Sequence, residues 1–332
     1  MAPKIATIDA SEPLDKILDA IARDGGVIVS NFLEPELLND SMRAIEPFFS
    51  GGKMYDPKSA QKDLGDDFFP EGSQRAYGLL AKMPEQIIKI IRLDVWQGVM
   101  ARFLNGEFVG FNGANKTTRK SGYILSSTAA IRLVPGAERQ ALHRDDVNYG
   151  TGSLHDPKNP LFTPMVGCLI AGSRATYKNG ATAVIPGSHL WGPDRAPKVE
   201  ECTYAEMEPG SALFTLGTTY HGGGTNQCQK TDPDAVRTLF AIFGQRDFYR
   251  QDQQEILSTP IETARSFPDD ILRLTGYCKN ICPSNQYPAW NLELTRVLSL
   301  DKAVGGVGFI GDHQDPAEFL HVDTNGVGKF SK

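Results

Sequence analysis

Five short segments rich in β-branched and aromatic residues fill the middle of this chain and limit the folds that it can adopt. Each is bounded by Gly, Pro, Asn or Asp, at 123–134, 164–173, 182–186, 211–216 and 236–243. Short runs of this kind, separated by turn residues, are typical of strands in a sandwich or barrel. The second half of the chain is therefore predicted to be rich in β-sheet.

The N-terminal part follows a helical period instead. Apolar residues at helical spacing predict a helix over 12–23, with Ser11 as its N-cap and Gly25 and Gly26 at its end. Further helices are predicted at 34–49, 84–104 and 268–274, with a strand at 27–32 and a loop or lid at 52–74. Helices followed by many short strands favour an α+β protein in which the N-terminal helices cover one sheet of a β-sandwich or barrel.

Composition argues against several classes of protein. The 332 residues carry a net charge of −6 and no basic run, so no nucleic-acid partner is expected. No apolar run approaches the roughly 20 residues that span a bilayer, and the N-terminus lacks the layout of a secretory signal. Together these two features favour a cytoplasmic protein without a membrane span. Five scattered cysteines favour reduced thiols, and this includes Cys278 and Cys282, whose spacing alone is weak support for zinc.

Two histidines and one aspartate form the most informative constellation. His143 and Asp145 are two residues apart, so at the end of a strand their side chains would leave the same face and could bind one ion. A His-x-Asp pair at a strand end is also common on protein surfaces without a metal. With His221 far downstream, they form the facial triad that suits Fe(II) in oxygen-using enzymes. His189 is a rival ligand, but its place in a turn after Pro-Gly-Ser favours a structural histidine. Asp146 would point to the opposite face of a continuing strand and is expected to support the site.

The segment 179–189, Asn-Gly-Ala-Thr-Ala-Val-Ile-Pro-Gly-Ser-His, lies between these motifs and is more specific. Together with the triad and Arg237, it resembles the iron(II)- and 2-oxoglutarate-dependent dioxygenases of the phytanoyl-CoA dioxygenase-like superfamily. Residues 140–146, Gln-Ala-Leu-His-Arg-Asp-Asp, are similar to the version found in fungal secondary-metabolite oxygenases that act on meroterpenoids and alkaloids. The resemblance covers about 131–243 and implies a double-stranded β-helix, the jelly roll of cupin-like proteins.

The resemblance also implies roles for individual residues. It makes His143, Asp145 and His221 the ligands of Fe(II), and it places four residues at the cosubstrate 2-oxoglutarate: Gln140, Thr182, Arg237 and Arg75. A planar guanidinium suits a carboxylate, although a surface arginine at 237 and a turn-forming threonine at 182 are the alternative interpretations. The interval from His221 to Arg237 is longer than the family usually has, which we interpret as a lengthened hairpin loop.

The implied reaction uses O2 to oxidise an unactivated C–H bond by hydroxylation, desaturation or rearrangement, with succinate and CO2 as co-products. The expected substrate is a small lipophilic secondary metabolite such as a terpenoid, meroterpenoid or alkaloid. An acyl-CoA or other primary metabolite, and a non-catalytic jelly-roll binding protein, remain alternatives. A single domain over 1–332 is expected, with a helical part to about 105, a jelly-roll core at about 120–250 and an extension at 251–332. A homodimer is also implied, and the irregular segments 52–76, 147–163 and 280–325 are predicted to contact the substrate.

Overall fold

The computed structural model describes residues 4–49, 72–149, 159–251 and 255–277, together with two short strands, β13 (His321–Val322) and β14 (Gly328–Lys329). Most of each segment predicted to contact the substrate lies outside these described residues, as do Cys278 and Cys282. The prediction for those segments therefore stays a prediction.

The N-terminal elements alternate between strand and helix, as β1 (Thr7–Asp9), α1 (Leu14–Asp24), β2 (Gly26–Ser30) and α2 (Pro35–Phe49). Helix α1 ends at Gly25, whose left-handed φ of 79° supports the predicted stop. The predicted N-cap at Ser11 was wrong. Ser11 donates from its backbone N–H and its hydroxyl to the Asp9 carboxylate, so it belongs to the turn after β1, and Pro13 precedes the helix.

The helix predicted over 84–104 is two helices, α5 (Pro84–Ile91) and α6 (Asp94–Leu104), which follow the short α4 (Leu79–Lys82). Leu93 between them has an extended backbone. The break lets each helix bury its own apolar face, and α6 packs against β6, β7 and β12 with Trp96 fully buried. The Trp96 indole donates a hydrogen bond to the Ile242 carbonyl, which fixes α6 on the sheet.

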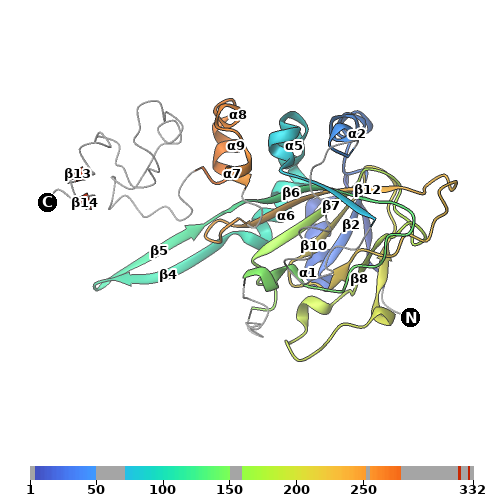
Figure 1. Cartoon of the computed structure of the whole chain (residues 1–332). Helices are drawn as coiled ribbons and strands as arrows, with labels where there is room; N and C mark the ends of the chain where they lie inside the picture. The colour runs from blue at the N-terminus through green and yellow to red at the C-terminus, as the bar shows by residue number, and fades with distance from the viewer. Residues whose placement is uncertain are drawn as a thin grey trace.

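The strands form two main sheets. The large sheet has the order β1-β2-β10-β7-β12-β6-β3 and the small one β11-β8-β9. The other strands of the large sheet are β3 (Ser73–Tyr77), β6 (Tyr123–Leu133), β7 (Met165–Ala171), β10 (Ala212–Leu216) and β12 (Arg237–Arg246). The small sheet consists of β8 (Thr182–Val184), β9 (Thr203–Ala205) and β11 (His221–Gly222). Figure 1 shows the hairpin of β4 (Gly106–Asn112) and β5 (Asn115–Ser121) extending away from the sheets.

Helices cover one face of the large sheet, and the small sheet lies over the other. Successive side chains of β12 point to opposite faces of the large sheet. Phe240 and Ile242 belong to the hydrophobic core shared with the helices, whereas Leu239 and Ala241 belong to the core between the two sheets. This mainly β arrangement with flanking N-terminal helices confirms the predicted fold class. Among the described residues after β12 are three short helices, α7 (Glu255–Ser258), α8 (Ile261–Arg265) and α9 (Asp269–Leu274).

None of the helices described here combines the length and the apolar character that crossing a bilayer requires.

Candidate active site

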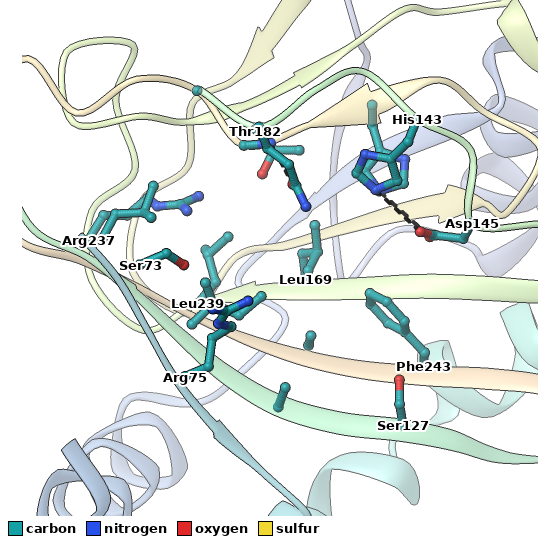
Figure 2. Close-up of a pocket in the computed structure, with 18 of the residues that line it drawn as sticks. Ser73, Arg75, Ser127, His143, Asp145, Leu169, Thr182, Arg237, Leu239 and Phe243 are labelled. Atoms are coloured by element: carbon teal, nitrogen blue, oxygen red, sulfur yellow. Dashed lines mark hydrogen bonds and ion pairs between the residues drawn. The ribbon is translucent and has the colours of Figure 1, made fainter. Parts of the chain in front are cut away.

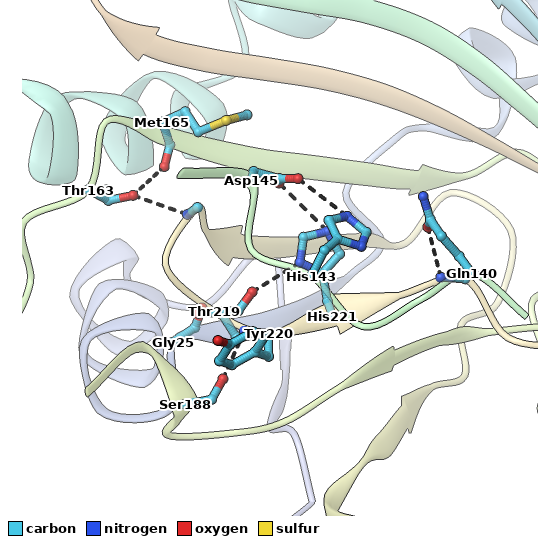
Figure 3. Close-up of polar contacts among 12 residues, drawn as sticks. Gly25, Gln140, His143, Asp145, Thr163, Met165, Ser188, Thr219, Tyr220 and His221 are labelled. Carbon is cyan, nitrogen blue, oxygen red and sulfur yellow. Dashed lines mark hydrogen bonds and ion pairs between the residues drawn. The ribbon is translucent and has the colours of Figure 1, made fainter. Parts of the chain in front are cut away.

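His143 and His221 come together through a short backbone pairing between the two metal motifs. The His143 N–H donates to the His221 carbonyl and the His221 N–H donates to the His143 carbonyl, both at 2.9 Å. Residues paired in this way present their side chains on the same face. The imidazole rings therefore lie side by side, with centroids 4.6 Å apart, as Figure 3 shows.

Backbone carbonyls orient both imidazoles. His143 Nδ1 lies 2.8 Å from the Ala141 carbonyl oxygen, and His221 Nδ1 lies 3.0 Å from that of Thr219. Because a carbonyl oxygen can only accept, each Nδ1 carries the proton and each Nε2 keeps its lone pair. The two Nε2 atoms face the Asp145 carboxylate at 3.5 and 3.6 Å, and the three ligand atoms lie within 4.8 Å of one another. This donor set can hold a divalent metal ion and leaves coordination positions open.

The electrostatics of the three groups differ. Burial lowers the pKa of His143, but the Asp145 carboxylate and the Ala141 carbonyl outweigh it and hold that pKa above its usual value. Burial dominates at His221, whose pKa lies below the usual value. For Asp145, burial raises the pKa, yet the facing histidines keep it below the usual range. The carboxylate is therefore charged at neutral pH, as a metal ligand must be.

The chain does not continue as a strand after His143. A 3₁₀ helix, η1 (Asp145–Tyr149), begins at Asp145 itself, so the expectation that Asp146 points away across a strand was wrong. Its backbone N–H donates to the Gly217 carbonyl, and its side chain is buried. This turn places the Asp145 carboxylate next to the Nε2 atoms of both imidazoles.

The triad opens into a cavity of about 200 Å³ between the two sheets. Its floor consists of alternate residues on neighbouring strands of the large sheet, with Arg237, Leu239, Ala241 and Phe243 on β12 opposite Leu133, Ile131, Ala129 and Ser127 on β6. Figure 2 shows the arginines gathered at one end of this cavity and Phe243 with Ser127 below Asp145 at the other.

All four predicted cosubstrate residues line this cavity with the triad. Arg237 opens β12, Thr182 opens β8, and Arg75 projects from the edge strand β3. The Gln140 carboxamide oxygen accepts a hydrogen bond from the Gly223 N–H, which leaves its NH2 group available as a donor. The long interval before Arg237 therefore does not carry this residue away from the site.

Arg237 provides an independent test of whether the cavity suits an anionic cosubstrate. Its side chain is 2% exposed, and its Nε and Nη1 have no hydrogen-bond partner among the described residues. Burial lowers the pKa of this guanidinium to about 10, so it still carries its charge at neutral pH. A buried cation with unused donors at one end of a cavity suits the distal carboxylate of 2-oxoglutarate, and the triad suits Fe(II).

Other histidines and glycines near the site have structural roles. His189 is fully buried and its Nε2 lies 3.2 Å from the Ala22 carbonyl, in agreement with its interpretation as a structural histidine. The glycine run after His221 reflects close backbone packing, because a Cβ at Gly224 would lie 2.6 Å from the Ala181 carbonyl oxygen.

Sequence reasoning missed the apolar part of the cavity. Phe243, Met165 and Leu169 line it, but none was assigned a role. A signal existed for Phe243, because every second residue from Arg237 onward on the same strand faces the cavity. No comparable signal identified Met165 or Leu169, since their strand is buried on both faces and does not alternate.

Comparison with known proteins places this geometry in context. The family model described as phytanoyl-CoA dioxygenase matches residues 21–232. The dioxygenase swnH1 of Metarhizium robertsii is 31% identical over 275 residues, which cover 83% of this chain and 86% of that protein. The dioxygenase trt7 of Aspergillus terreus is 40% identical over 168 residues, covering 50% of this chain and 55% of that protein.

Two solved structures also match this chain. AviO1 from Streptomyces viridochromogenes matches with a TM-score of 0.46 and 19% identity, over 71% of this chain and 96% of that one. The non-heme alpha ketoglutarate dependent carbocyclase SnoK from nogalamycin biosynthesis matches with a TM-score of 0.47 and 15% identity, over 73% and 89%.

Proposed function

We propose that this chain, which belongs to the phytanoyl-CoA dioxygenase family, oxidises a C–H bond of a lipophilic small molecule. As a member of that family it is a dioxygenase that uses Fe(II), 2-oxoglutarate and O2. His143, Asp145 and His221 are the proposed iron ligands. Arg237, Arg75, Thr182 and Gln140 are the proposed contacts of 2-oxoglutarate. The observation that carries the proposal is the presence of all seven side chains around one cavity.

When bound, Fe(II) supplies oxidation chemistry in which dioxygen and 2-oxoglutarate are consumed, a substrate C–H bond is oxidised, and succinate and carbon dioxide are released. The chain prepares for this by fixing its own groups. Hydrogen bonds from both Nδ1 atoms to backbone carbonyls keep the Nε2 lone pairs aimed at one point, and the charged Asp145 completes the donor set. With only three protein ligands, a bound Fe(II) would keep coordination positions open for small molecules.

The charged end of the cavity determines how the cosubstrate lies. The Arg237 guanidinium can hold the distal carboxylate in a bidentate pair, and Arg75 enters from the neighbouring edge of the sheet. A cosubstrate anchored at Arg237 would point its keto acid end across the cavity towards His143 and Asp145, which lie on the other side in Figure 2. Such positioning, rather than proton transfer by the protein, is the contribution that the chain makes.

The other end of the cavity supports a lipophilic substrate. Phe243, Met165 and Leu169 give it an apolar wall, and Ser127 adds one hydroxyl beside Phe243. An apolar wall holds a hydrocarbon portion of the substrate near the metal and excludes water. With the resemblance of residues 140–146 to fungal secondary-metabolite oxygenases, this favours a terpenoid, meroterpenoid or alkaloid over an acyl thioester.

An anaerobic titration with Fe(II) and 2-oxoglutarate tests the proposal. The wild-type protein should develop the weak visible absorbance of a metal–keto acid chelate, and in air it should release succinate. His143→Ala and Asp145→Ala should lose both signals. Wild-type protein without absorbance or succinate would be a non-catalytic jelly-roll protein and would overturn the proposal.

A homodimer and a cytoplasmic location complete the proposal on the basis of the family resemblance. Size-exclusion chromatography with light scattering tests the dimer, because a monomeric mass at micromolar concentration would contradict it. Fractionation of the producing cells tests the location.

A further inference from the structure

A β-bulge lies at the apolar end of the cavity. Strands β6 and β12 pair regularly up to Phe243 opposite Ser127, and the next pair is Gly244 opposite Leu125. Ser126 is therefore the extra residue of the bulge. Bulges re-aim side chains and are frequent beside active sites.

The Ser126 hydroxyl has a specific partner there. It lies 3.1 Å from the Tyr149 hydroxyl, which in turn donates to Gln245 Oε1 at 3.1 Å. The Gln245 amide is fixed from its other side, because its Nε2 donates to the Tyr249 carbonyl at 2.7 Å. Since the Tyr149 proton is used towards Gln245, the Ser126 O–H is the donor to Tyr149. Ser126 and Gln245 are both fully buried.

Tyr149 is the last residue of η1, the short helix that begins at Asp145. Its ring packs against Tyr249 with centroids 5.2 Å apart, and Tyr249 packs against Phe248 at 4.9 Å. The hydroxyl and the ring of Tyr149 are thus held independently. At the other end of η1, the Asp146 N–H is bonded to the Gly217 carbonyl.

We propose that Tyr149 is a positioning residue for the metal site, which acts by fixing η1 and so the direction of the Asp145 carboxylate. This rests on the proposed role of Asp145 as an iron ligand. The strand part of the metal motif ends at His143, so the backbone pairing that holds the histidines does not extend to Asp145. The Ser126–Tyr149–Gln245 bonds connect the far end of η1 to both strands of the bulge.

The experiment compares Tyr149→Phe with the matched control Tyr249→Phe. Both variants remove one phenol hydroxyl from the same aromatic row, but the Tyr249 hydroxyl makes no hydrogen bond to the residues that the structure describes. Fe(II) affinity is measured anaerobically, with and without 2-oxoglutarate, and the melting temperature of the metal-free protein is measured alongside. Loss of an outer hydrogen bond that orients a ligand typically lowers metal affinity about 10-fold or more.

We expect Tyr149→Phe to weaken Fe(II) binding about 10-fold and to shift the absorbance band of the chelate, with Tyr249→Phe within twofold of wild type. Ser126→Ala, which removes one of the two bonds, should weaken binding in the same direction and covers the case in which Tyr149→Phe does not fold. If Tyr149→Phe lowers the melting temperature but leaves the Fe(II) affinity and the absorbance band unchanged, Tyr149 has only a structural role. That result would overturn the inference.

Failure of the inference is distinguishable from failure of the proposed function. If the wild-type protein binds no Fe(II), the proposed function fails. If the wild type binds Fe(II) and Tyr149→Phe binds it equally well, only the positioning role fails.

Discussion

Arg237→Met should have opposite effects on the stability of the metal-free protein and on its affinity for 2-oxoglutarate. The Arg237 guanidinium is buried, and its Nε and Nη1 lack hydrogen-bond partners in the described part of the chain. Burial lowers its pKa to about 10 from an ordinary value above about 12, which corresponds to about 3 kcal/mol. A base with a lowered pKa is destabilising at every pH below its folded pKa, so this penalty is fully present at neutral pH.

Methionine keeps most of the side-chain volume of Arg237 and carries no charge. After some loss of packing, we expect Arg237→Met to raise the free energy of unfolding of the metal-free protein by about 2 kcal/mol at pH 7. The same change removes two charge-assisted hydrogen bonds to the distal carboxylate of 2-oxoglutarate. At about 1.5 kcal/mol or more for each bond, the Kd of 2-oxoglutarate should rise about 100-fold.

Urea unfolding of the metal-free protein and calorimetric titration of the Fe(II)-loaded protein measure the two effects. Arg132→Met is the matched control, because Arg132 lies opposite Thr238 on the adjacent strand, outside the cavity, and pairs with Glu46. It should leave the Kd of 2-oxoglutarate unchanged. Arg237→Met protein that is less stable than wild type and still binds 2-oxoglutarate within threefold of it would refute the reasoning.

Three further predictions concern other parts of the site and its supports. His143→Ala should abolish Fe(II)-dependent succinate release with an unchanged far-ultraviolet circular dichroism spectrum, and succinate release that survived would remove His143 from the ligand set. Burial raises the pKa of Glu255 from 4.5 to about 7. Between these two pH values the folded protein keeps a proton that the unfolded chain has released. The free energy of unfolding should therefore fall by about 3 kcal/mol as the pH rises from 4.5 to 7. Urea unfolding from pH 4.5 to 8 checks this, and Glu255→Gln should flatten the dependence. Gly25→Ala should destabilise the protein by about 3 kcal/mol in urea unfolding, because the new Cβ would lie 2.5 Å from His189 Nδ1 and the backbone is left-handed. Gly187→Ala shares the left-handed backbone with open space around it and should cost only about 1 kcal/mol.

The sequence by itself determined the fold class and the chemical type of the site. The β-branched and aromatic residues of 236–243 and the turn residues between the short segments are local properties, so they predicted strands that the structure contains. Helix α1 with its stop at Gly25 is equally local. The triad and the segment 179–189 identified the family through residue types and order alone, without any knowledge of distances.

Tertiary structure decided where those residues meet. Arg75 reaches the cavity only because β3 joins the edge of the large sheet beside β6, and no local period encodes which strand becomes a neighbour. The split of 84–104 into two helices follows from the different surfaces that each must cover, because α6 packs against the sheet whereas α5 packs against α2, α4 and α6. The contact from Ser126 to Tyr149 starts at a bulge between strands more than 100 residues apart in the chain. Pairing over such separations is set by packing of the whole sheet, which is why only the folded chain reveals it.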